Sequence, residues 1–400
     1  MTTVTDGSRP RLWNSNYTKV WTANFTIFFS FYLLTPLLPL YLRDTFHAGK
    51  DMTGLVLSGY TFTALLTRPL GGFLVDSFPR QKVLLISLLL FALFFAGYFV
   101  TWSLLLFALV RTLHGAPFGA TTVANSTVAI DVLHPERRAE GIGYYGLSNN
   151  IATAIGPSVG YFLYTTTHDF NLLFAISLVT ALTGVAIVAT LHPRERRPAT
   201  VQPKQRLSLD RFFLVKGWSE GVVMMLLSFG YGVISTYLAI YSRDIMHLSG
   251  GTGTFFALLA LGLIASRLVG SRSLRKGRVV ENAQWGMLLS LFGYLLFVAR
   301  PDAWGYYGAA LIIGLGNGHM FPALQTMFIN LVHHNRRGTA NSTQLVTWDV
   351  GMGLGIIVGG LLAEHFGYAS AFWAAFAVNA AGVTFFWTYV RKDYQKNKLR

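Results

Sequence analysis

The 400-residue sequence contains no cysteine. Disulfide bonds, thiol chemistry and cysteine-ligated metal sites are therefore excluded. Charged residues are also scarce, at 12% of the chain, whereas soluble domains carry about 25%. Because 52% of the residues are hydrophobic, the composition indicates an all-α membrane protein with many spans and not a soluble enzyme.

The sequence also lacks the motifs of energy-converting and metal-dependent enzymes. It has no Gly-x4-Gly-Lys-Ser/Thr loop that would cradle a phosphate, so no nucleotide-hydrolysing motor is expected. No group of His, Asp and Glu has metal-ligand spacing. We therefore expect no enzyme activity, no cofactor and no metal. Any transport must use an ion gradient or the gradient of the substrate itself.

Apolar stretches long enough to cross a bilayer recur along the chain. A hydrocarbon core of about 30 Å needs roughly 20 apolar residues per helix. That length predicts twelve membrane helices, at 20–42, 52–76, 82–101, 104–129, 139–164, 170–191, 217–242, 250–272, 280–299, 304–332, 339–363 and 368–390. The long connection 192–216, rich in proline and arginine, separates an N-terminal bundle (1–191) from a C-terminal bundle (217–400). Residues 210–213 are expected to form a short surface helix.

Basic residues are distributed unevenly between the loops. Of the 32, 25 fall in segments on the same side as the N-terminus, four fall in the opposite loops, and three lie inside predicted helices. Because basic residues gather in cytoplasmic loops, both termini are predicted to be cytoplasmic. Membrane topology thus explains the net charge of +15, and no nucleic-acid partner is expected.

The two bundles repeat each other at an offset of 199 residues. The aligned identities are Arg68 with Arg267, Gly71 with Gly270, Gly115 with Gly314, Gly119 with Gly318, Arg137 and Arg138 with Arg336 and Arg337, Gly156 with Gly355, and Gly160 with Gly359. A repeat of six helices, an even number, keeps one orientation in both copies. Parallel repeats of this kind place a substrate site between the halves, near the membrane midplane.

Three short motifs follow one another along the first bundle. They are Gly72, Asp76 and Arg80 after the second helix, Arg111 and Gly115 in the fourth, and Gly156, Pro157 and Gly160 in the fifth. On the twofold repeat, this order resembles the major facilitator superfamily over residues 17–392. The resemblance implies two six-helix bundles that transport a substrate by alternating access. It also implies export in exchange for protons, with which the fifth-helix motif is associated in that superfamily.

An ionisable side chain at membrane depth is costly unless it is paired or hydrated, so each one is a candidate for function. Asp349 is the one acid predicted near mid-depth. In the superfamily that the chain resembles, helix two packs on helix eleven and helix five on helix eight. That packing, with the repeat, predicts an ion pair of Arg68 with Asp349 and a polar contact of Arg267 with Asn150.

Protonation of Asp349 would release Arg68 and weaken one contact between the bundles, which would couple protons to their movement. The alternatives are a permanent bridge, or an Arg68 that bonds only backbone carbonyls.

Arg111 and His114 lie one turn apart and share a helix face with Gly115. The resemblance implies that Arg111 faces the cavity and interacts with an anionic or proton-carrying group. A histidine titrates near neutral pH, so His114 is a candidate proton relay. The alternative is a hydrogen-bonded structural histidine, and His319 has the same two interpretations.

Charged residues gather at the predicted cytoplasmic helix ends, namely Asp76, Arg80, Asp131, Arg137 and Arg138. Together with the motif residue Gly72, we expect them to form a gate, a charge cluster that closes the cytoplasmic face and breaks when that face opens. It is not expected to bind substrate.

The fifth-helix motif has two interpretations. Pro157 removes one backbone hydrogen bond and is expected to interrupt and bend the helix, whereas Gly160 lets a neighbouring helix approach. The segment is either a hinge or seam that serves transport, or simply a kinked helix.

Polar and aromatic side chains of several helices are candidates to line a central cavity. They are Tyr32, Asn149, Tyr231, Asn317, His319, Gln325, Gln344 and Trp348. For any single aromatic residue, the alternative is packing against lipid or other helices.

The sequence therefore predicts a secondary transporter of the inner (plasma) membrane that functions as a monomer and exports a small organic molecule in exchange for protons. An importer or facilitator of a sugar or organic acid, a lipid flippase, and a sensor or scaffold without transport are the alternatives. The direction of proton flux on addition of substrate separates the first two.

Overall fold

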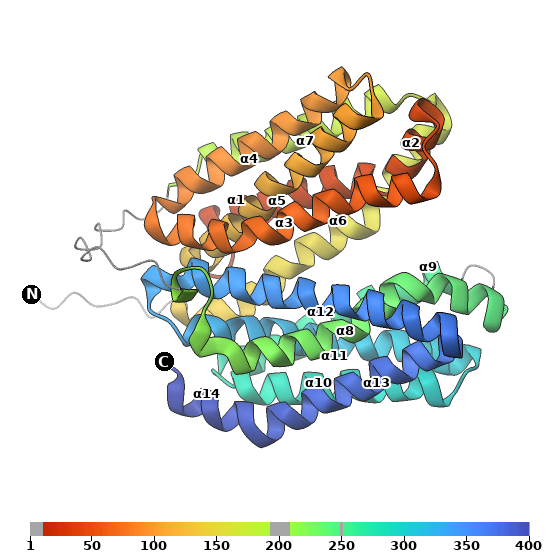
Figure 1. Ribbon diagram of the computed structural model, residues 1–400. Coiled ribbons are helices and arrows are strands. Elements are labelled where there is room, and N and C mark those ends of the chain that lie inside the picture. Colours follow the sequence, from red (N-terminus) through yellow and green to blue (C-terminus); the bar gives the residue numbers. More distant parts are fainter. Residues whose placement is uncertain (1–10, 193–208, 249–250, 400) are drawn as a thin grey trace, which may run out of the picture.

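The computed structural model describes residues 11–192, 209–248 and 251–399, and within these ranges the regular elements are all helices. The first group comprises α1 (Ser15–Leu34), α2 (Leu38–Phe46), α3 (Lys50–Ser77), α4 (Arg80–Gly97), α5 (Leu104–Val132), α6 (Arg138–Thr167) and α7 (Phe170–Ala189). The second comprises α8 (Trp218–Ile240), α9 (Gly251–Arg275), α10 (Val279–Ala299), α11 (Ala303–Asn330), α12 (Arg337–Phe366), α13 (Tyr368–Phe385) and α14 (Arg391–Asn397). Figure 1 shows the two groups as separate bundles lying side by side.

Within the described ranges, seven helical segments are long and apolar enough to cross a membrane, and α1 with α2 would make an eighth. The seven are Arg80–Val100, Leu104–Val132, Phe170–Ala189, Val215–Leu238, Val279–Ala299, His334–Phe366 and Tyr368–Asn397. Twelve spans therefore stay a prediction. The expected surface helix near residue 210 is a single 3-10 turn, Leu209–Arg211.

The first predicted span, 20–42, is not one straight helix. It is divided into α1 and α2, which meet at an angle of 41°. Pro36 lies in the break and Pro39 in the first turn of α2. A proline lacks an N–H and clashes with the preceding turn, so two prolines three residues apart end one helix and start another.

The last predicted span, 368–390, also departs from the prediction. After α13, a π-helical turn (Phe386–Val390) leads into α14, which extends the helical chain to Asn397. Arg391, Lys392 and Asp393 made this segment read as a polar tail in the sequence, but α14 turns the buried Tyr394 onto the bundle.

The expectation that Pro157 interrupts the fifth helix is wrong. α6 continues without a break from Arg138 to Thr167, with Pro157 inside it. Its two motif glycines instead lie against α1, where a methyl group on Gly156 would come within 3.2 Å of the Leu33 nitrogen and one on Gly160 within 3.4 Å of Leu37 Cδ1. The motif thus allows close packing of α6 on α1, as expected for Gly160.

Close helix contacts recur in the two bundles. Gly115 of α5 lies against the backbone of Tyr60 in α3, and Gly314 of α11 lies against the backbone of Leu259 in α9. Each pair lies 199 residues after the other. In both places a side chain larger than hydrogen would collide with a backbone carbonyl, so glycine is required for these helices to touch.

The bundles contact each other where the resemblance predicted. α3 packs on α12, and α6 packs on α9. α1 begins beside the end of α5, where Asn14 Nδ2 donates to Val132 O at 3.0 Å. α14 ends beside the end of α11, where the Leu399 N–H donates to Asn330 O at 2.9 Å. We call this end of the molecule, where α1 begins and α14 ends, the termini side.

Candidate functional site

An ion pair joins the two bundles midway along α3 and α12. A guanidinium nitrogen of Arg68 binds the Asp349 carboxylate, and the same nitrogen donates to Leu345 O at 3.1 Å. Both side chains are mostly buried, with exposed fractions of 11% for Arg68 and 18% for Asp349. The pair expected from the sequence is therefore present, and the backbone bond exists in addition to it.

Aromatic side chains surround this pair. The Trp348 ring lies 5.5 Å from the Tyr231 ring and 4.5 Å, edge to face, from the Phe321 ring. Tyr32 lies beside Thr153 and within electrostatic range of Arg68 and Asp349. These rings come from α1, α8, α11 and α12. Three of the predicted cavity residues, Tyr32, Tyr231 and Trp348, are thus gathered around the ion pair.

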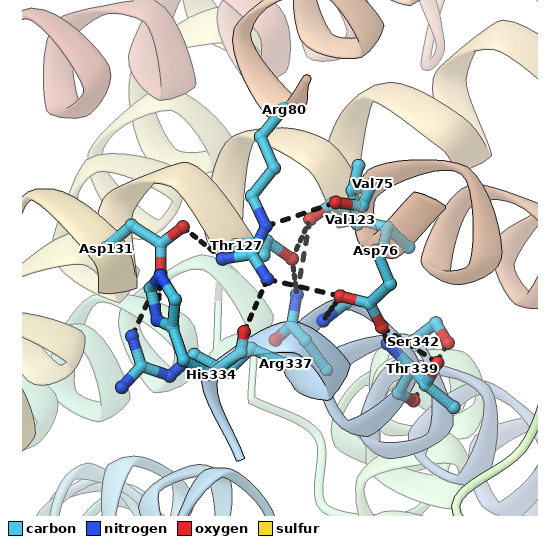
Figure 2. Close-up of polar contacts among 12 residues, drawn as sticks. Val75, Asp76, Arg80, Val123, Thr127, Asp131, His334, Arg337, Thr339 and Ser342 are labelled. Atoms are coloured by element: carbon cyan, nitrogen blue, oxygen red, sulfur yellow. Dashed lines mark hydrogen bonds and ion pairs between the residues drawn. The ribbon is translucent and has the colours of Figure 1, made fainter. Parts of the chain in front are cut away.

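A second group of charges lies at the termini side, where α3 ends and α12 begins (Figure 2). Asp76 accepts hydrogen bonds from the backbone N–H groups of Gly338 (2.8 Å) and Thr339 (2.7 Å), and from the Thr339 hydroxyl (2.9 Å). The first N–H groups of a helix have no partner within it and carry a partial positive charge. A carboxylate of one bundle thus completes the first turn of a helix in the other.

Arg80 connects Asp76 to the next acidic residue, Asp131. Its guanidinium binds Asp131, lies 3.2 Å from Asp76, and donates to His334 O at 2.8 Å. Asp131 is bound in turn by Arg337 at 2.9 Å. Figure 2 shows this chain of contacts running from α3 through α5 to α12. We call Asp76, Arg80, Asp131, Arg337 and Thr339 the termini-side cluster.

The sequence assigned the wrong arginines to this cluster. Arg137 pairs with Glu140 at 2.6 Å, and Arg138 Nε donates to Ile130 O at 3.3 Å. These bonds stay within the first bundle, because both arginines open the helix that follows Asp131 and point back along it. Arg337 of the second bundle occupies the expected place. The repeat aligns Arg138 with Arg337, and this was the signal that could have identified it.

Gly72 holds the two bundles close together beside the cluster. A methyl group on Gly72 would lie 2.9 Å from Gly338 O and 2.8 Å from Ser342 Cβ. Gly338 faces it from α12 with equally little space. α3 and α12 therefore touch through their backbones at this level.

An uncharged layer separates the termini-side cluster from the central ion pair. The Asn341 amide of α12 donates to Ser126 Oγ and, at 3.4 Å, to Thr127 Oγ1 of α5. Gln325 Nε2 supports Asn341 Oδ1 at 2.8 Å. Of the predicted cavity residues, Gln325 thus serves a contact between the bundles, while Gln344 is buried nearby on α12 with its Oε1 unbonded.

The end of the connecting segment lies against the same region. The Arg211 guanidinium lies 4.9 Å from the Phe73 ring of α3, and the Phe212 ring lies 5.4 Å from it. Leu214 N–H donates to Thr343 Oγ1 of α12 at 2.8 Å. Residues 209–214 therefore contact both bundles beside the termini-side cluster.

Arg111 does not meet the anionic partner that the resemblance implied. Its guanidinium lies 4.0 Å from the Tyr60 ring centre and donates to Tyr98 Oη at 3.0 Å. The same hydroxyl lies 2.8 Å from His114 Nδ1. His114 is fully buried among aromatic rings, which fits a structural histidine. Since α5 turns this face toward α3 and α4, aromatic faces and one hydroxyl replace a carboxylate.

Three other cavity candidates lie elsewhere. Asn317 accepts from Ser290 Oγ at 3.1 Å, and His319 Nδ1 lies 3.4 Å from Asn282 Oδ1, so both face α10 within their own bundle. Asn149 accepts from Thr153 on its own helix. The contact of Arg267 with Asn150 lies outside the described residues, because the Arg267 side chain is not among them. Within the described residues, no group of three or more His, Asp and Glu side chains is placed to hold a metal.

Known proteins of similar sequence and structure are membrane transporters. The quinolone resistance protein NorA of Staphylococcus aureus (strain COL) is 23% identical over 368 residues, which cover 90% of this chain and 92% of NorA. The uncharacterized MFS-type transporter YhhS of Escherichia coli (strain K12) is 25% identical over 374 residues, covering 91% and 90% of the two chains.

A crystal structure of a bacterial homologue of the iron transporter ferroportin, in an outward-facing state, superposes with a TM-score of 0.81 at 15% identity. The superposition covers 96% of this chain and 100% of that one. At this identity the likeness shows a shared fold. The sequence profile of the Major Facilitator Superfamily matches residues 20–282 and 283–400. The chain therefore belongs to the major facilitator superfamily, whose members are transporters and not enzymes.

Proposed function

We propose that this protein is a twelve-helix, proton-coupled exporter that moves a small organic molecule across the inner membrane by alternating access. One observation carries the proposal. Arg68 and Asp349, one from each bundle, form an ion pair halfway along the helices that join the bundles. A proton that binds Asp349 acts directly on a contact between the two moving parts.

The energetics of a buried pair support this coupling. Removing the charge of one partner in a buried ion pair costs about 3–5 kcal/mol, because the other charge is left unpaired. A protonated Asp349 is neutral, so Arg68 loses its partner and the arrangement in which α3 touches α12 becomes less stable. Proton binding thereby favours separation of the bundles at this level, and proton release favours their contact.

The termini-side cluster supplies the second part of an alternating-access cycle. Asp76, Arg80, Asp131 and Arg337 connect the bundles at one end, and Gly72 allows the close approach that their bonds require. In this proposal the termini side is cytoplasmic, so the cluster is the cytoplasmic gate. It must break for substrate to enter from the cytoplasm.

Two further observations favour export. The chain is similar over nine-tenths of its length to NorA, whose name describes quinolone resistance. It also has Gly156, Pro157 and Gly160 in α6, the motif that the superfamily associates with proton-exchanging exporters. The aromatic rings around Arg68 and Asp349 would contact an organic substrate by stacking and dispersion.

The proposal is tested in proteoliposomes that contain the purified protein and a pH-sensitive dye. Substrates are first selected from a compound panel by thermal stabilisation of the protein, since a ligand that binds the folded state raises its apparent stability. We expect an imposed pH gradient to drive substrate and protons in opposite directions, and Asp349→Asn to abolish this dependence. Asp169→Asn, which neutralises an exposed helix-capping acid, is the control and should behave as wild type.

Other results would assign other functions. Substrate and protons moving in the same direction would indicate an importer, and movement of labelled lipid between leaflets would indicate a flippase. Full gradient-driven transport by Asp349→Asn would contradict the coupling role of Asp349, and no flux of any tested compound would favour a sensor or scaffold.

A further inference from the structure

A buried carboxyl group at the start of α8 takes no part in the contacts between the bundles. Glu220 has an exposed fraction of 0%. Its Oε1 atom has no hydrogen-bond partner among the described residues. Burying a carboxylate with an unbonded oxygen is costly, whereas a protonated carboxyl group is neutral. The burial of Glu220 therefore favours its protonated form.

The neighbouring serine connects Glu220 to the last helix. Ser219 Oγ lies 3.1 Å from Glu220 Oε2 and 3.3 Å from Asp393 Oδ2 of α14. A serine hydroxyl has a single proton to donate. Both contacts are hydrogen bonds only if one of the two carboxyl groups carries a proton and donates it to Oγ. The series Glu220–Ser219–Asp393 is therefore complete with one added proton.

The surroundings offer little other compensation for a second negative charge. Lys216, on the turn before α8, lies in electrostatic range of Glu220, but its Nζ donates to Asn397 O at 2.9 Å. From α14, Asp393 and Tyr394 face Glu220. The other helices at this end of α8 present uncharged side chains, namely Phe328 of α11 at Gly217, Thr347 of α12 at Gly221, and Phe385 of α13 at Trp218.

α14 is held on the bundle by few other contacts. Tyr394 is buried and its Oη accepts from Asn330 Nδ2 at 3.0 Å. Asn397 bonds Asp393 within the helix, with Nδ2 donating to Oδ1 at 2.9 Å. A short helix of seven residues is marginal alone in water and depends on such docking contacts. Loss of the proton would leave two carboxylates around one hydroxyl, and their repulsion would act against docking.

We propose that Glu220 is a proton-binding site that controls the docking of α14 on α8. With the proton bound, Ser219 bridges Glu220 and Asp393, and α14 packs on the bundle. Without it, the two carboxylates repel and α14 is released. The site lies on the termini side and is separate from Asp349, so the second bundle responds there to the local proton concentration whether or not transport is proton-coupled.

Hydrogen exchange of the full-length protein in detergent, followed by mass spectrometry from pH 5.5 to 8.5, tests this proposal. After correction for the intrinsic pH dependence of exchange, we expect the opening constant of residues 391–399 to rise with pH. If the docked state binds one proton more than the released state, the rise approaches tenfold per pH unit above the midpoint. Glu220→Gln, which is neutral and similar in shape, should keep α14 protected at every pH.

Matched variants separate this effect from general unfolding. Glu281→Gln removes an exposed acid of α10, with an exposed fraction of 57%, and should retain the wild-type pH dependence. Ser219→Ala removes the bridge, and should raise the opening constant about tenfold at low pH. Exchange in the core of α10 should be equal in all variants, which shows that the bundle is folded.

Three results would overturn the proposal: a pH-independent opening of α14 in the wild type, wild-type pH dependence in Glu220→Gln, or wild-type protection in Ser219→Ala. None of these readouts requires transport. A failure here is therefore distinguishable from a failure of the exporter proposal.

Discussion

Asp76 accepts two hydrogen bonds from Thr339, one from the backbone N–H at 2.7 Å and one from the hydroxyl at 2.9 Å. The carboxylate belongs to α3 and the threonine to the first turn of α12. The negative charge therefore meets the positive end of a helix dipole in the other bundle. Closure of the termini side depends on this charge as well as on shape.

Neutralising Asp76 should open the termini side. Hydrogen bonds to a charged group contribute about 1.5–3 kcal/mol, and Asp76→Asn keeps the acceptor but loses the charge. We expect the closed arrangement to lose about 1.4 kcal/mol, which is tenfold in its equilibrium constant. Since the chain has no cysteine, a single Ser342→Cys reports opening by its rate of maleimide labelling.

The Asp76→Asn labelling rate should rise about tenfold by that estimate, while Asp169→Asn leaves it unchanged. In transport, turnover should slow more than substrate binding weakens. The opposite pattern, weakened binding with normal turnover, would argue against a gate.

A methyl group at Gly72 should separate α3 from α12. In Gly72→Ala the new Cβ would lie 2.9 Å from Gly338 O, which is backbone and cannot rotate away. Gly353→Ala, on α12, adds the same methyl group where no atom lies within 4 Å. We expect faster labelling of Ser342→Cys with Gly72→Ala and none of this change with Gly353→Ala. Equal labelling in both would show that the contact is not needed for closure.

The uncharged layer should respond differently to pH from the ion pair. Asn341→Ala removes amide bonds to α5 and leaves Gln325 without its acceptor, at a cost of about 1–3 kcal/mol. Because no group in this layer titrates near neutral pH, the change in transport rate should be the same factor at every pH. Asn149→Ala, an amide bonded within α6, is the control. A pH-dependent effect of Asn341→Ala would contradict this assignment.

The hydroxyl of Tyr98 should stabilise the first bundle through Arg111 and His114. Tyr98→Phe keeps the ring but leaves two buried nitrogens without their partner, so we expect a loss of about 1–3 kcal/mol in the free energy of unfolding. Tyr161→Phe, at an exposed residue of α6, is the matched control. Thermal unfolding in detergent measures both, and equal melting temperatures would refute the role of the hydroxyl.

The central pair could be predicted from the sequence because few residues competed for it. Ionisable groups are rare in the predicted spans, and the family resemblance indicated that the helices of Arg68 and Asp349 pack together. The same reasoning failed for Arg337. Arg137 and Arg138 lie nearer to Asp131 in the sequence, whereas the arginine in contact comes from the other bundle, and short sequence separation does not show which way a helix start points.

The faces of the helices were harder to predict than their positions. Asn317 and His319 are polar residues inside a membrane helix, which made them candidates for the cavity, but their partners Ser290 and Asn282 are on α10. Nearly every face of these helices is apolar, so the pattern of hydrophobic residues does not show which face meets the other bundle. Glu220 was recognised as an acid near a helix start, but its partner Asp393 lies beyond the last predicted span.

α12 carries all of these contacts on one straight rod. It has no proline from Arg337 to Phe366, and Gly351 and Gly355 fix it against Met225 and Phe229 of α8. Twelve residues, about 18 Å, separate Thr339 from Gly351. If α12 pivots at these glycines, a tilt of about 10° moves its first turn about 3 Å at that length, which is enough to break a hydrogen bond.

The residues next to the pivot move far less. The contacts would then be lost in order of their distance from Gly351: first those of Arg337 and Thr339, next those of Asn341, and last that of Asp349. In that order, the pair of Arg68 with Asp349 is the final restraint, so a single proton at the contact that moves least decides whether the whole rod is free to tilt.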